Sequence, residues 1–471
     1  MNTKKQVFKY VFFDWICTMT AWTLFFIYRK IYLEPKKFGF QDTIDFDTNF
    51  YLGLFLIPLA WIALYGLSGH YQRIFKKYRL KELGQIFFAS IFGTLIIFFV
   101  LILDDQIATY KDYYSAFGIF FSLHFFLGLI PRIILTTQTV KKIHTRKFGF
   151  KTILIGGGSK ALEIFHEVNS LKKYPGFDFK GFISLNGAHN ELNKSGLQLL
   201  GFHDKIEEVI VEHGIQEAII AVEPTEHENI SNIITQLEGH DLTVNIIPDI
   251  YNILSGSVKM TSIFGTPLIE VSRDIMPSWQ KSFKRFMDIS VSLFALIVLS
   301  PLYLMITILV AMSSKGPIFF KQERIGIHGK PFNIFKFRTM YVDAEKSGPA
   351  LSSTNDPRVT PIGRTLRKVR LDEFPQFYNV LISDMSLVGP RPERAFFIDK
   401  ITKVAPHYKH LQKVKPGITS WGQVKYGYAE NVDQMVQRLK YDVLYIENMS
   451  LAVDFKILGY TVLIVLRGAG K

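Results

Sequence analysis

Two adjacent carboxylates, Asp372 and Glu373, stand among permanent cations in the segment 336–394 of this chain. The cations of this segment that concern us are Lys336, Arg338, Arg364, Arg367, Arg370, Arg391 and Arg394. Guanidinium groups bind planar oxyanions such as phosphate, and paired carboxylates suit a divalent metal or a carboxylate nucleophile. The combination predicts a site for phosphoryl transfer.

A solvated helix face with internal ion pairs is the alternative for any short segment rich in arginine and acids. Two neighbouring runs argue against it, Lys-Phe-Arg-Thr-Met at 336–340 and Gly-Pro-Arg-Pro-Glu at 389–393. Both place cations among glycine, proline or aromatic residues, which are typical of functional loops and turns. The sequence therefore favours a site over a plain surface helix.

Six sequence blocks occur in one order over the C-terminal part of the chain: 283–288, 316–326, 336–340, 371–376, 384–392 and 415–419. Through them the segment 281–466 resembles the bacterial polyprenyl-phosphate glycosyl-1-phosphate transferases. These monotopic phosphoglycosyl transferases begin the assembly of exopolysaccharide and O-antigen. Six blocks in order are more specific than any single motif.

The resemblance implies a reaction in two steps. Asp372 would attack the sugar-linked phosphate of a UDP-sugar, release UMP and carry the sugar phosphate as a covalent intermediate. Polyprenyl (undecaprenyl) phosphate would then take up the sugar phosphate as a polyprenyl diphosphosugar. The implied cofactor is Mg²⁺, with Asp372 and Glu373 as its protein ligands, although Glu373 could instead handle a proton.

The same resemblance assigns substrate binding to further residues. They are Lys336, Arg367 and Arg391, with weaker matches at Arg338 and Arg324. Asp442 and Asp454 also match family positions, where helix capping or ion pairing is an equal alternative to substrate contact. The run 423–430 replaces an Asn-Gly-Arg turn that many relatives carry, so the sugar stays open, with glucose and galactose as candidates.

The composition predicts a membrane protein with globular parts. The chain has 471 residues, 48% of them hydrophobic, and a mean hydropathy of +0.17. Because long apolar runs accompany the net charge of +14, we expect an anionic lipid bilayer and phosphorylated substrates as partners, and no nucleic acid. Cys17 is the only cysteine, which excludes disulfides and cysteine metal sites.

Four apolar stretches open the chain, at about 7–28, 50–67, 86–103 and 113–135. Each approaches the ~20 residues that cross ~30 Å of hydrocarbon, so we expect four transmembrane helices within 1–140. Lysine and arginine gather before the first stretch, between the second and third, and after the fourth. By the positive-inside rule, the N-terminus and everything after 140 face the cytoplasm of a bacterial inner-membrane protein.

The hydrophobic period changes to that of strands from residue 150. A buried strand at 152–155, a G-x-G-x-x-A turn at 156–161 and a helix at 162–171 begin a series with further strands at 179–183, 217–222 and 242–247. This predicts a Rossmann-like α/β domain at 150–260. The second strand is followed by Ser-Leu-Asn, without an acid for a ribose, which favours a regulatory or dimer-forming role over dinucleotide binding. A homodimer is expected from the long members of the family.

A fifth apolar run, 289–312, precedes the site. As a simple span it would export the site away from cytosolic nucleotide sugars. Ser300-Pro301 breaks the run, because proline lacks a backbone donor and clashes with the preceding turn. With basic residues at both ends, we expect a re-entrant helix at 286–313 inside an α-rich catalytic domain at 279–471, while a kinked spanning helix is the alternative. The run 451–466 should form an amphipathic helix lying in the membrane interface.

Two other functions compete with the transferase. A membrane-anchored nucleotide-sugar dehydratase needs a Tyr-x-x-x-Lys pair, and Tyr32 with Lys36 is the one such spacing, in a predicted extracytoplasmic loop. A non-catalytic scaffold for polysaccharide assembly is the second alternative. The intact Asp372, Glu373 and Arg391 argue against it.

Overall fold

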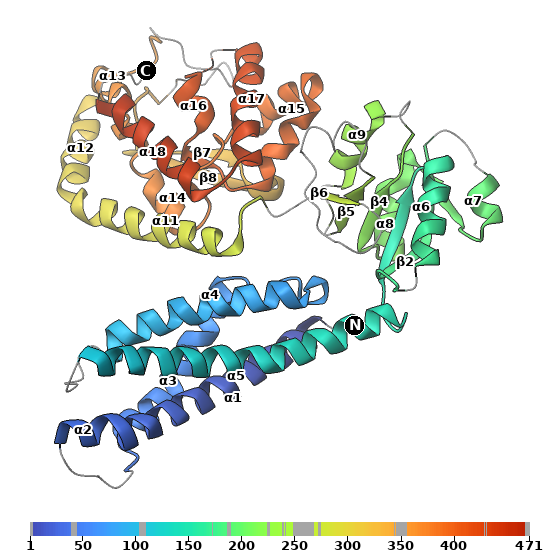
Figure 1. The fold of residues 1–471 in the computed structure, drawn as a ribbon. Helices are drawn as coiled ribbons and strands as arrows, with labels where there is room; N and C mark the ends of the chain where they lie inside the picture. Colours follow the sequence, from blue (N-terminus) through green and yellow to red (C-terminus); the bar gives the residue numbers. More distant parts are fainter. Residues whose placement is uncertain are drawn as a thin grey trace. The chain divides into compact units, whose positions relative to one another are not determined.

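The computed structural model describes residues 3–38, 45–102, 110–171, 173–185, 190–223, 227–237, 240, 242–247, 268–271, 275–342, 344, 356–427, 429 and 431–466. The chain forms two compact units, residues 1–225 with 242–271, and residues 226–241 with 272–471 (Figure 1). Residues 103–109, after the third apolar stretch, and 248–267 and 272–274, before residue 275, lie outside the described residues.

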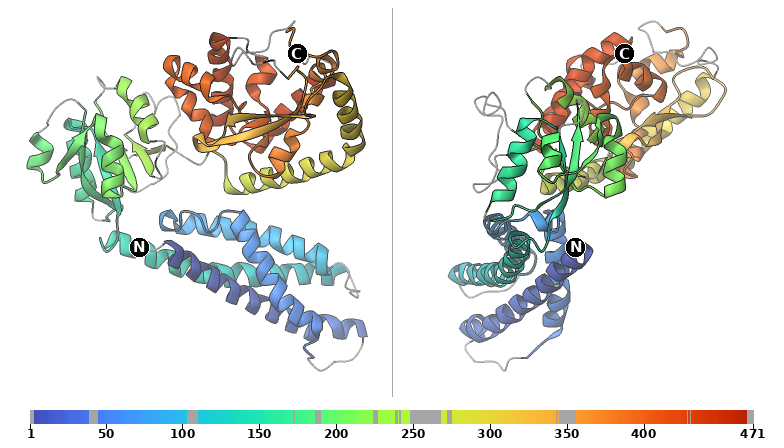
Figure 2. Two further views of the ribbon diagram at one scale, coloured as in Figure 1. Left: turned by 180° about the vertical axis from the view of Figure 1, so that it is seen from behind. Right: turned by 90° about the vertical axis from the view of Figure 1, so that its right-hand side faces the viewer.

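Four long helices form the N-terminal part of the first unit. They are α1 (Thr3–Tyr28), α3 (Thr48–Leu67), α4 (Arg79–Ile97) and α5 (Tyr110–His144). Helix α1 continues through η1 (Arg29–Leu33) into α2 (Glu34–Phe38), η2 (Ile74–Lys76) lies before α4, and η3 (Phe98–Ile102) extends α4. By length and composition each of the four can cross a membrane, which confirms the four predicted apolar helices. Helix α1 packs on α3 and α5, and α4 packs on α5 (Figures 1 and 2).

A cluster of charged side chains is buried between these helices. Arg132 of α5 donates two hydrogen bonds to the Asp14 carboxylate of α1, at 2.9 and 2.6 Å. Its remaining terminal nitrogen lies 3.4 Å from the Glu82 carboxylate of α4, and Lys77 lies 3.2 Å from the same group. Since two cations face two anions, the burial of each charge is compensated by its neighbours.

A six-stranded sheet follows the helices. Its strands are β1 (Phe150–Ile155), β2 (Phe177–Ser184), β3 (Leu199–Phe202), β4 (Glu217–Ile220), β5 (Thr243–Ile246) and β6 (Ile269–Val271), in the order β3-β2-β1-β4-β5-β6. The first five are parallel, and β6 is antiparallel to β5. The helices between them in the chain are α6 (Ser159–Ser170), α7 (Asn190–Lys194), η4 (His203–Lys205), α8 (Ile206–His213) and α9 (His227–Leu237). This confirms the predicted parallel α/β sheet, and adds β3 and β6 to the predicted strands.

Two helices and a β-hairpin open the second unit. Helices α11 (Ser278–Val298) and α12 (Ser300–Ser313) meet at Leu299 with a bend of 63°. Pro301 lies in the first turn of α12, where a missing backbone donor costs nothing. Strands β7 (Phe319–Ile325) and β8 (Pro331–Phe337) then pair antiparallel across η6 (Ile327–Gly329).

Short elements complete this unit around two hydrophobic clusters. They are α13 (Pro361–Lys368), η7 (Leu371–Glu373), α14 (Gln376–Leu381), β9 (Ser386–Val388), α15 (Ala395–Val404), η8 (Pro406–Lys413), β10 (Gly417–Thr419), α16 (Trp421–Lys425), α17 (Val432–Glu447) and α18 (Leu451–Leu466). Strand β10 runs parallel to β9. The smaller cluster is formed by Ile306, Val310, Phe337 and Leu366. The larger one, the core of the unit, joins β8, α14, α15, α17 and α18 through residues such as Ile334, Val380, Ile401, Tyr445 and Ile457.

The first half of α11 is fixed to this core by polar contacts. Arg285 donates to the carbonyl oxygens of Val380 and Leu381 at the end of α14, at 2.7 and 2.9 Å. The buried Asp288 carboxylate accepts from the Leu387 backbone N–H of β9 at 2.9 Å. These bonds satisfy helix-end and strand-edge groups that would otherwise stay unpaired, so α11 is an integral part of the unit.

Large apolar side chains cover the outer side of the two bent helices. Those that are more than half exposed are Trp279, Phe286, Phe294, Ile297, Val298, Leu304, Met305, Ile308 and Met312. Monomeric soluble proteins seldom expose so much contiguous apolar surface, whereas a lipid-facing helix requires it. The pair α11 and α12 therefore has the surface of a membrane-inserted element.

Candidate active site

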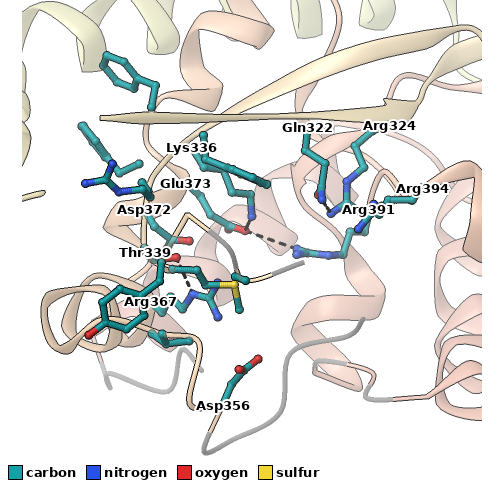
Figure 3. Close-up of a pocket in the computed structure, with 18 of the residues that line it drawn as sticks. Gln322, Arg324, Lys336, Thr339, Asp356, Arg367, Asp372, Glu373, Arg391 and Arg394 are labelled. Carbon is teal, nitrogen blue, oxygen red and sulfur yellow. Dashed lines mark hydrogen bonds and ion pairs between the residues drawn. The ribbon is translucent and has the colours of Figure 1, made fainter. Parts of the chain in front are cut away.

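A cavity of about 390 Å³ lies in the second unit, between the β7–β8 hairpin, the turn η7 and helices α13, α15 and α17 (Figure 3). Charged residues from distant parts of the sequence line it: Arg324, Lys336, Arg338, Asp356, Arg364, Arg367, Asp372, Glu373, Arg391, Glu393, Arg394 and Arg438. Aromatic side chains such as Phe319, Phe320 and Tyr341 form part of its wall. A cavity that combines apolar walls with converging charges is typical of a small-molecule site.

The turn η7 places both predicted carboxylates in this cavity. Arg370, directly before it, has a φ of 57°, a left-handed conformation that costs energy for a residue with a side chain. The following 3₁₀ turn sets successive side chains about 120° apart, so Asp372 and Glu373 can both point inward. They are 7% and 6% exposed.

Glu373 is held by two cations. The Lys336 Nζ atom of β8 lies 2.7 Å from its Oε1, and an Arg391 terminal nitrogen lies 3.7 Å from the same oxygen (Figure 3). Burial raises the pKa of Glu373, but the positive charges of Lys336 and Arg391 outweigh burial and lower it to about 2. Glu373 is therefore a fixed anion at neutral pH.

Asp372 differs from its neighbour. Within the described part of the chain, no hydrogen bond or ion pair reaches its carboxylate, although Lys336, Arg367 and Arg391 act on it at longer range. Burial is the largest effect and raises the pKa of Asp372. A buried carboxylate without a bonded partner keeps its lone pairs available, which is what a nucleophile requires.

Helix α13 supplies the cations on one side of the two acids. Its first turn is capped by the Thr360 hydroxyl, which accepts from the Gly363 N–H at 3.0 Å, and Pro361 occupies the first turn. Arg367 in its last turn donates to the Thr339 hydroxyl at 2.9 Å (Figure 3). This bond fixes the guanidinium of Arg367 at the cavity.

A second charged group lies at the other end of the cavity. The buried Glu393 carboxylate accepts from Arg438 of α17 at 2.7 Å and from Arg324 of β7 at 3.3 Å. Arg324 also donates to the Gln322 side chain at 2.6 Å (Figure 3). Glu393 thus sets the positions of two guanidinium groups that line the cavity.

Arg338 connects the cavity to the bent helices. One of its terminal nitrogens donates to the carbonyl oxygens of Val310 and Ser314, at 3.2 and 2.5 Å, and so caps the end of α12. The other terminal nitrogen and Nε have no partner among the described residues, although the side chain is only 5% exposed. Buried, unpaired guanidinium donors beside a cavity suit an anionic substrate group.

Two predicted site residues do not line the cavity. The Asp442 carboxylate accepts from the Gly422 N–H of α16 at 3.0 Å and lies 4.0 Å from Arg438. The Asp454 carboxylate pairs with Lys284 at 2.6 Å and accepts from the Tyr445 hydroxyl at 2.7 Å. Asp442 therefore caps the start of α16, and Asp454 forms an ion pair with Lys284. Helix capping or ion pairing is the alternative that the sequence left open for both residues.

The two acids of η7 are candidate donors for a metal in this cavity. No cluster of three or more His, Cys, Asp or Glu side chains that could hold a metal ion occurs among the described residues. Magnesium commonly uses one or two protein carboxylates and takes its other ligands from substrate phosphates and water. Asp372 and Glu373 fit that pattern, since both present carboxylate oxygens to one cavity.

Sequence comparison covers the whole of this site. The family described as "Bacterial sugar transferase" matches residues 279–468, which include every residue of the cavity lining. An uncharacterized sugar transferase of Bacillus subtilis is 38% identical over 187 residues, 40% of this chain and 89% of that protein. The chain belongs to the bacterial sugar transferase family. The chain is accordingly an enzyme of the transferase class.

Two further relatives have named activities. A UDP-N-acetylgalactosamine-undecaprenyl-phosphate N-acetylgalactosaminephosphotransferase of Aeromonas hydrophila is 39% identical over 225 residues, 48% of the sugar transferase chain and about half, 52%, of that relative. A UDP-glucose:undecaprenyl-phosphate glucose-1-phosphate transferase of Klebsiella pneumoniae is 29% identical over 430 residues, 88% of the chain and 90% of the relative.

The family described as "CoA-binding domain" matches residues 66–248.

Sequence reasoning brought together five of the residues at the centre of the sugar transferase cavity, Lys336, Arg367, Asp372, Glu373 and Arg391. It gave no role to Gln322, Thr339, Asp356, Glu393 or Arg438, which also line it. The one available signal was Glu393 itself, an acid within the arginine-rich run 391–394. Its partner Arg438 is distant in sequence and has no local pattern that marks it.

Proposed function

We propose that this chain transfers a sugar-1-phosphate from a UDP-sugar to undecaprenyl phosphate and releases UMP, the initiating step of exopolysaccharide, capsule or O-antigen assembly. The observation that carries the proposal is the buried, unbonded Asp372 beside a cation-held Glu373 in one cavity. The activities printed for the Aeromonas and Klebsiella relatives are of this kind.

In the first step, a carboxylate oxygen of Asp372 attacks the phosphorus that bears the sugar. The new bond is an acyl phosphate, and the bond that breaks joins this phosphorus to the oxygen of UMP, which leaves with its electron pair. Lys336, Arg367 and Arg391 surround the reacting phosphate and neutralise the charge that develops on it. The product on the enzyme is a sugar-phosphoryl aspartate.

In the second step, a phosphate oxygen of undecaprenyl phosphate attacks the same phosphorus, and the bond to Asp372 breaks. The aspartate is regenerated and the lipid leaves as a diphosphate-linked sugar. Arg338 lies between the cavity and the end of α12, so its unpaired nitrogens suit the acceptor phosphate of a membrane-bound lipid. The covalent intermediate separates the departure of UMP from the attack of the lipid phosphate, so the diphosphate donor and the lipid phosphate need not meet in one transition state.

The proposed cofactor is Mg²⁺, which the carboxylates of Asp372 and Glu373 would hold. When bound, the metal supplies charge neutralisation on the diphosphate of the donor. Glu373 suits this role, because its low pKa keeps it anionic throughout the neutral range.

The test is UMP release by the purified full-length protein with undecaprenyl phosphate, Mg²⁺ and a panel of UDP-glucose, UDP-galactose and UDP-N-acetylgalactosamine. We expect UMP from at least one donor, a loss of at least about 10³-fold in Asp372→Asn, and a loss of activity in EDTA that Mg²⁺ restores. Asp399→Asn, an exposed acid of α15, is the control and should keep full activity. A folded wild-type protein that releases no UMP from any donor would refute the proposal.

Catalysis on cytosolic UDP-sugars requires the cavity to face the cytoplasm, so we propose that α11 and α12 form a re-entrant hairpin in the inner membrane. Their bend and their exposed apolar side support this. The test places single cysteines at Lys281 and Lys315, the two ends of the hairpin, in a Cys17→Ser background. An impermeant maleimide should label both in inside-out vesicles and neither in intact cells. Labelling of the two ends from opposite sides would instead show a spanning helix.

The proposal includes a multi-pass N-terminal part and a homodimer as the working form. Native mass spectrometry from lipid nanodiscs would measure the oligomeric state directly. A single mass of one chain under conditions that preserve activity would exclude the dimer.

A further inference from the structure

The β4 strand of the α/β sheet ends beside the glycine turn that follows β1. In the strand order, β2 and β3 lie on one side of β1, whereas β4, β5 and β6 lie on the other. The gap between β1 and β4 is therefore the switch point at which doubly wound domains bind the phosphates of nucleotides. In such domains the phosphate accepts hydrogen bonds from the N-terminus of the first helix, which here is α6.

A carboxylate of the chain itself occupies this position. The Oε1 atom of Glu223, after β4, accepts a hydrogen bond from the Lys160 backbone N–H at 3.0 Å and from the Ser159 hydroxyl at 2.9 Å. Both donors belong to the first turn of α6. The hydrogen bond from Lys160 is the main reason that the pKa of Glu223 is lowered, so the group carries a negative charge at neutral pH.

The glycines of the turn accommodate this carboxylate. A Cβ atom at Gly158 would lie 2.6 Å from the Glu223 carboxylate oxygen, so a side chain there would force this carboxylate to shift. Gly156 has a φ of +128°, and a Cβ there would lie 2.1 Å from the Ala221 carbonyl oxygen of the same β4 segment. The absence of side chains thus lets the β4 segment and Glu223 approach the turn closely, where a phosphate-binding domain would leave room for its ligand.

The residues present do not fit an external nucleotide or CoA at this turn. A diphosphate would have to displace an anion already bonded to the helix, and like charges at this distance repel. We propose that Glu223 is the permanent anionic ligand of the α6 N-terminus, and that this domain binds neither CoA nor a dinucleotide through its glycine turn. The glycine turn then serves to join β4 to α6 inside the domain.

Hydrogen exchange measured on the full-length protein in lipid nanodiscs tests this, read on peptides covering 156–171. In the wild type, CoA, NAD⁺ and inorganic pyrophosphate should leave exchange of these peptides unchanged. Glu223→Ala should speed exchange of the Lys160 amide about tenfold, because its acceptor is lost. Inorganic pyrophosphate should then restore the protection, since it can enter the emptied position.

Two further variants complete the design. Glu223→Gln keeps the size and an acceptor oxygen but removes the charge, so its exchange should fall between wild type and Glu223→Ala even if the alanine variant folds poorly. Glu212→Ala, an exposed acid of α8, should behave as the wild type. Protection of 156–171 by CoA or NAD⁺ in the wild type, or unchanged exchange in both Glu223 variants, would overturn the inference. The readout is local to α6 and independent of UMP release.

Discussion

Asp372 and Glu373 are neighbours in sequence, yet the cavity treats them differently. Lys336 and Arg391 bond to Glu373, whereas no residue that the structure describes bonds to the Asp372 carboxylate. Glu373 thus remains an anion whatever the pH of the cell, while the charge of Asp372 depends on the balance between burial and more distant cations. A pair of acids whose environments separate them in this way is typical of two different catalytic roles.

Lys336 controls the pH dependence of the proposed reaction. Its charge lowers the pKa of both acids, so Lys336→Met should raise both. Because attack requires the anionic form of Asp372, the rate falls as pH drops through the pKa of this residue. The acid limb of the profile of kcat/KM against pH should therefore move to higher pH by about one unit or more in Lys336→Met.

The matched control for this variant is Lys330→Met, an exposed lysine just before β8 in the same hairpin. It should keep the wild-type pH profile. An acid limb that stays in place in Lys336→Met, with only the maximal rate reduced, would show that Lys336 binds substrate without tuning Asp372.

Glu393 is expected to contribute to stability through its two arginine partners. Replacing it by glutamine leaves Arg324 and Arg438 buried beside each other without their shared anion, which costs about 3 kcal/mol. The double variant Glu393→Gln with Arg438→Met removes one of the uncompensated charges and should recover part of this loss. Thermal unfolding in detergent measures both.

Glu323→Gln, in the same strand as Arg324 but exposed, is the control for Glu393→Gln. It should unfold at the same temperature as the wild type. If the double variant were no more stable than Glu393→Gln, the carboxylate would act through something other than its arginine pair.

The sequence predicted those site residues that lie in distinctive local runs. Lys336 lies near the end of β8 between aromatic residues, not in the turn that its neighbours suggested. Arg391 has proline on both sides, and Asp372 with Glu373 forms a conspicuous pair. Arg438 could not be predicted in this way, because it lies on α17 in an ordinary amphipathic pattern and acquires its role from a carboxylate that the fold brings to it.

At the scale of elements, burial decided which strands could be predicted. The strands β1 and β4 are almost fully buried and read as continuous apolar runs. Strand β3 lies at the edge of its sheet and is only partly buried, so its short sequence carries no clear pattern. The β7–β8 hairpin was missed for the same reason, since β7 is mostly exposed and rich in polar residues.

The bend between α11 and α12 illustrates a feature that sequence does predict. Ser300-Pro301 marks the break in an otherwise uniform apolar run, and the helices separate one residue before it. The sequence could not show what holds the bend. The Tyr303 hydroxyl donates to the Phe374 carbonyl oxygen at 2.8 Å, directly after the turn that bears Asp372. The bent helices and the turn η7 are thereby bonded to each other.

At the scale of the whole chain, composition and apolar runs predicted the four apolar helices and the parallel sheet that follows them. They could not predict how the apolar helices pair, because lipid-facing and helix-facing positions carry the same residue types. The buried charges supply that specificity, since Asp14, Glu82 and Arg132 come from three different helices.

Removing one charge from this cluster should destabilise the helical part. Asp14→Asn removes the carboxylate that accepts two hydrogen bonds from Arg132, and Glu82 remains as the acid that faces this arginine. We expect the free energy of unfolding to fall by about 3 kcal/mol. Asp14→Asn combined with Arg132→Met should be more stable than Asp14→Asn alone. The fraction of monodisperse protein after heating in detergent measures the effect, with the exposed Asp45→Asn as control. Equal behaviour of Asp14→Asn and wild type would contradict it.

The pairing of Asp14 with Arg132 also bears on biogenesis. Asp14 lies in the first of these four helices and Arg132 in the last, so the acid is synthesised well before its partner. An unpaired carboxylate in hydrocarbon is costly, which disfavours early release of the first helix into lipid. The translocation machinery, or a chaperone beside it, would have to retain α1 until α5 has been synthesised. The four helices would then be released into the bilayer together.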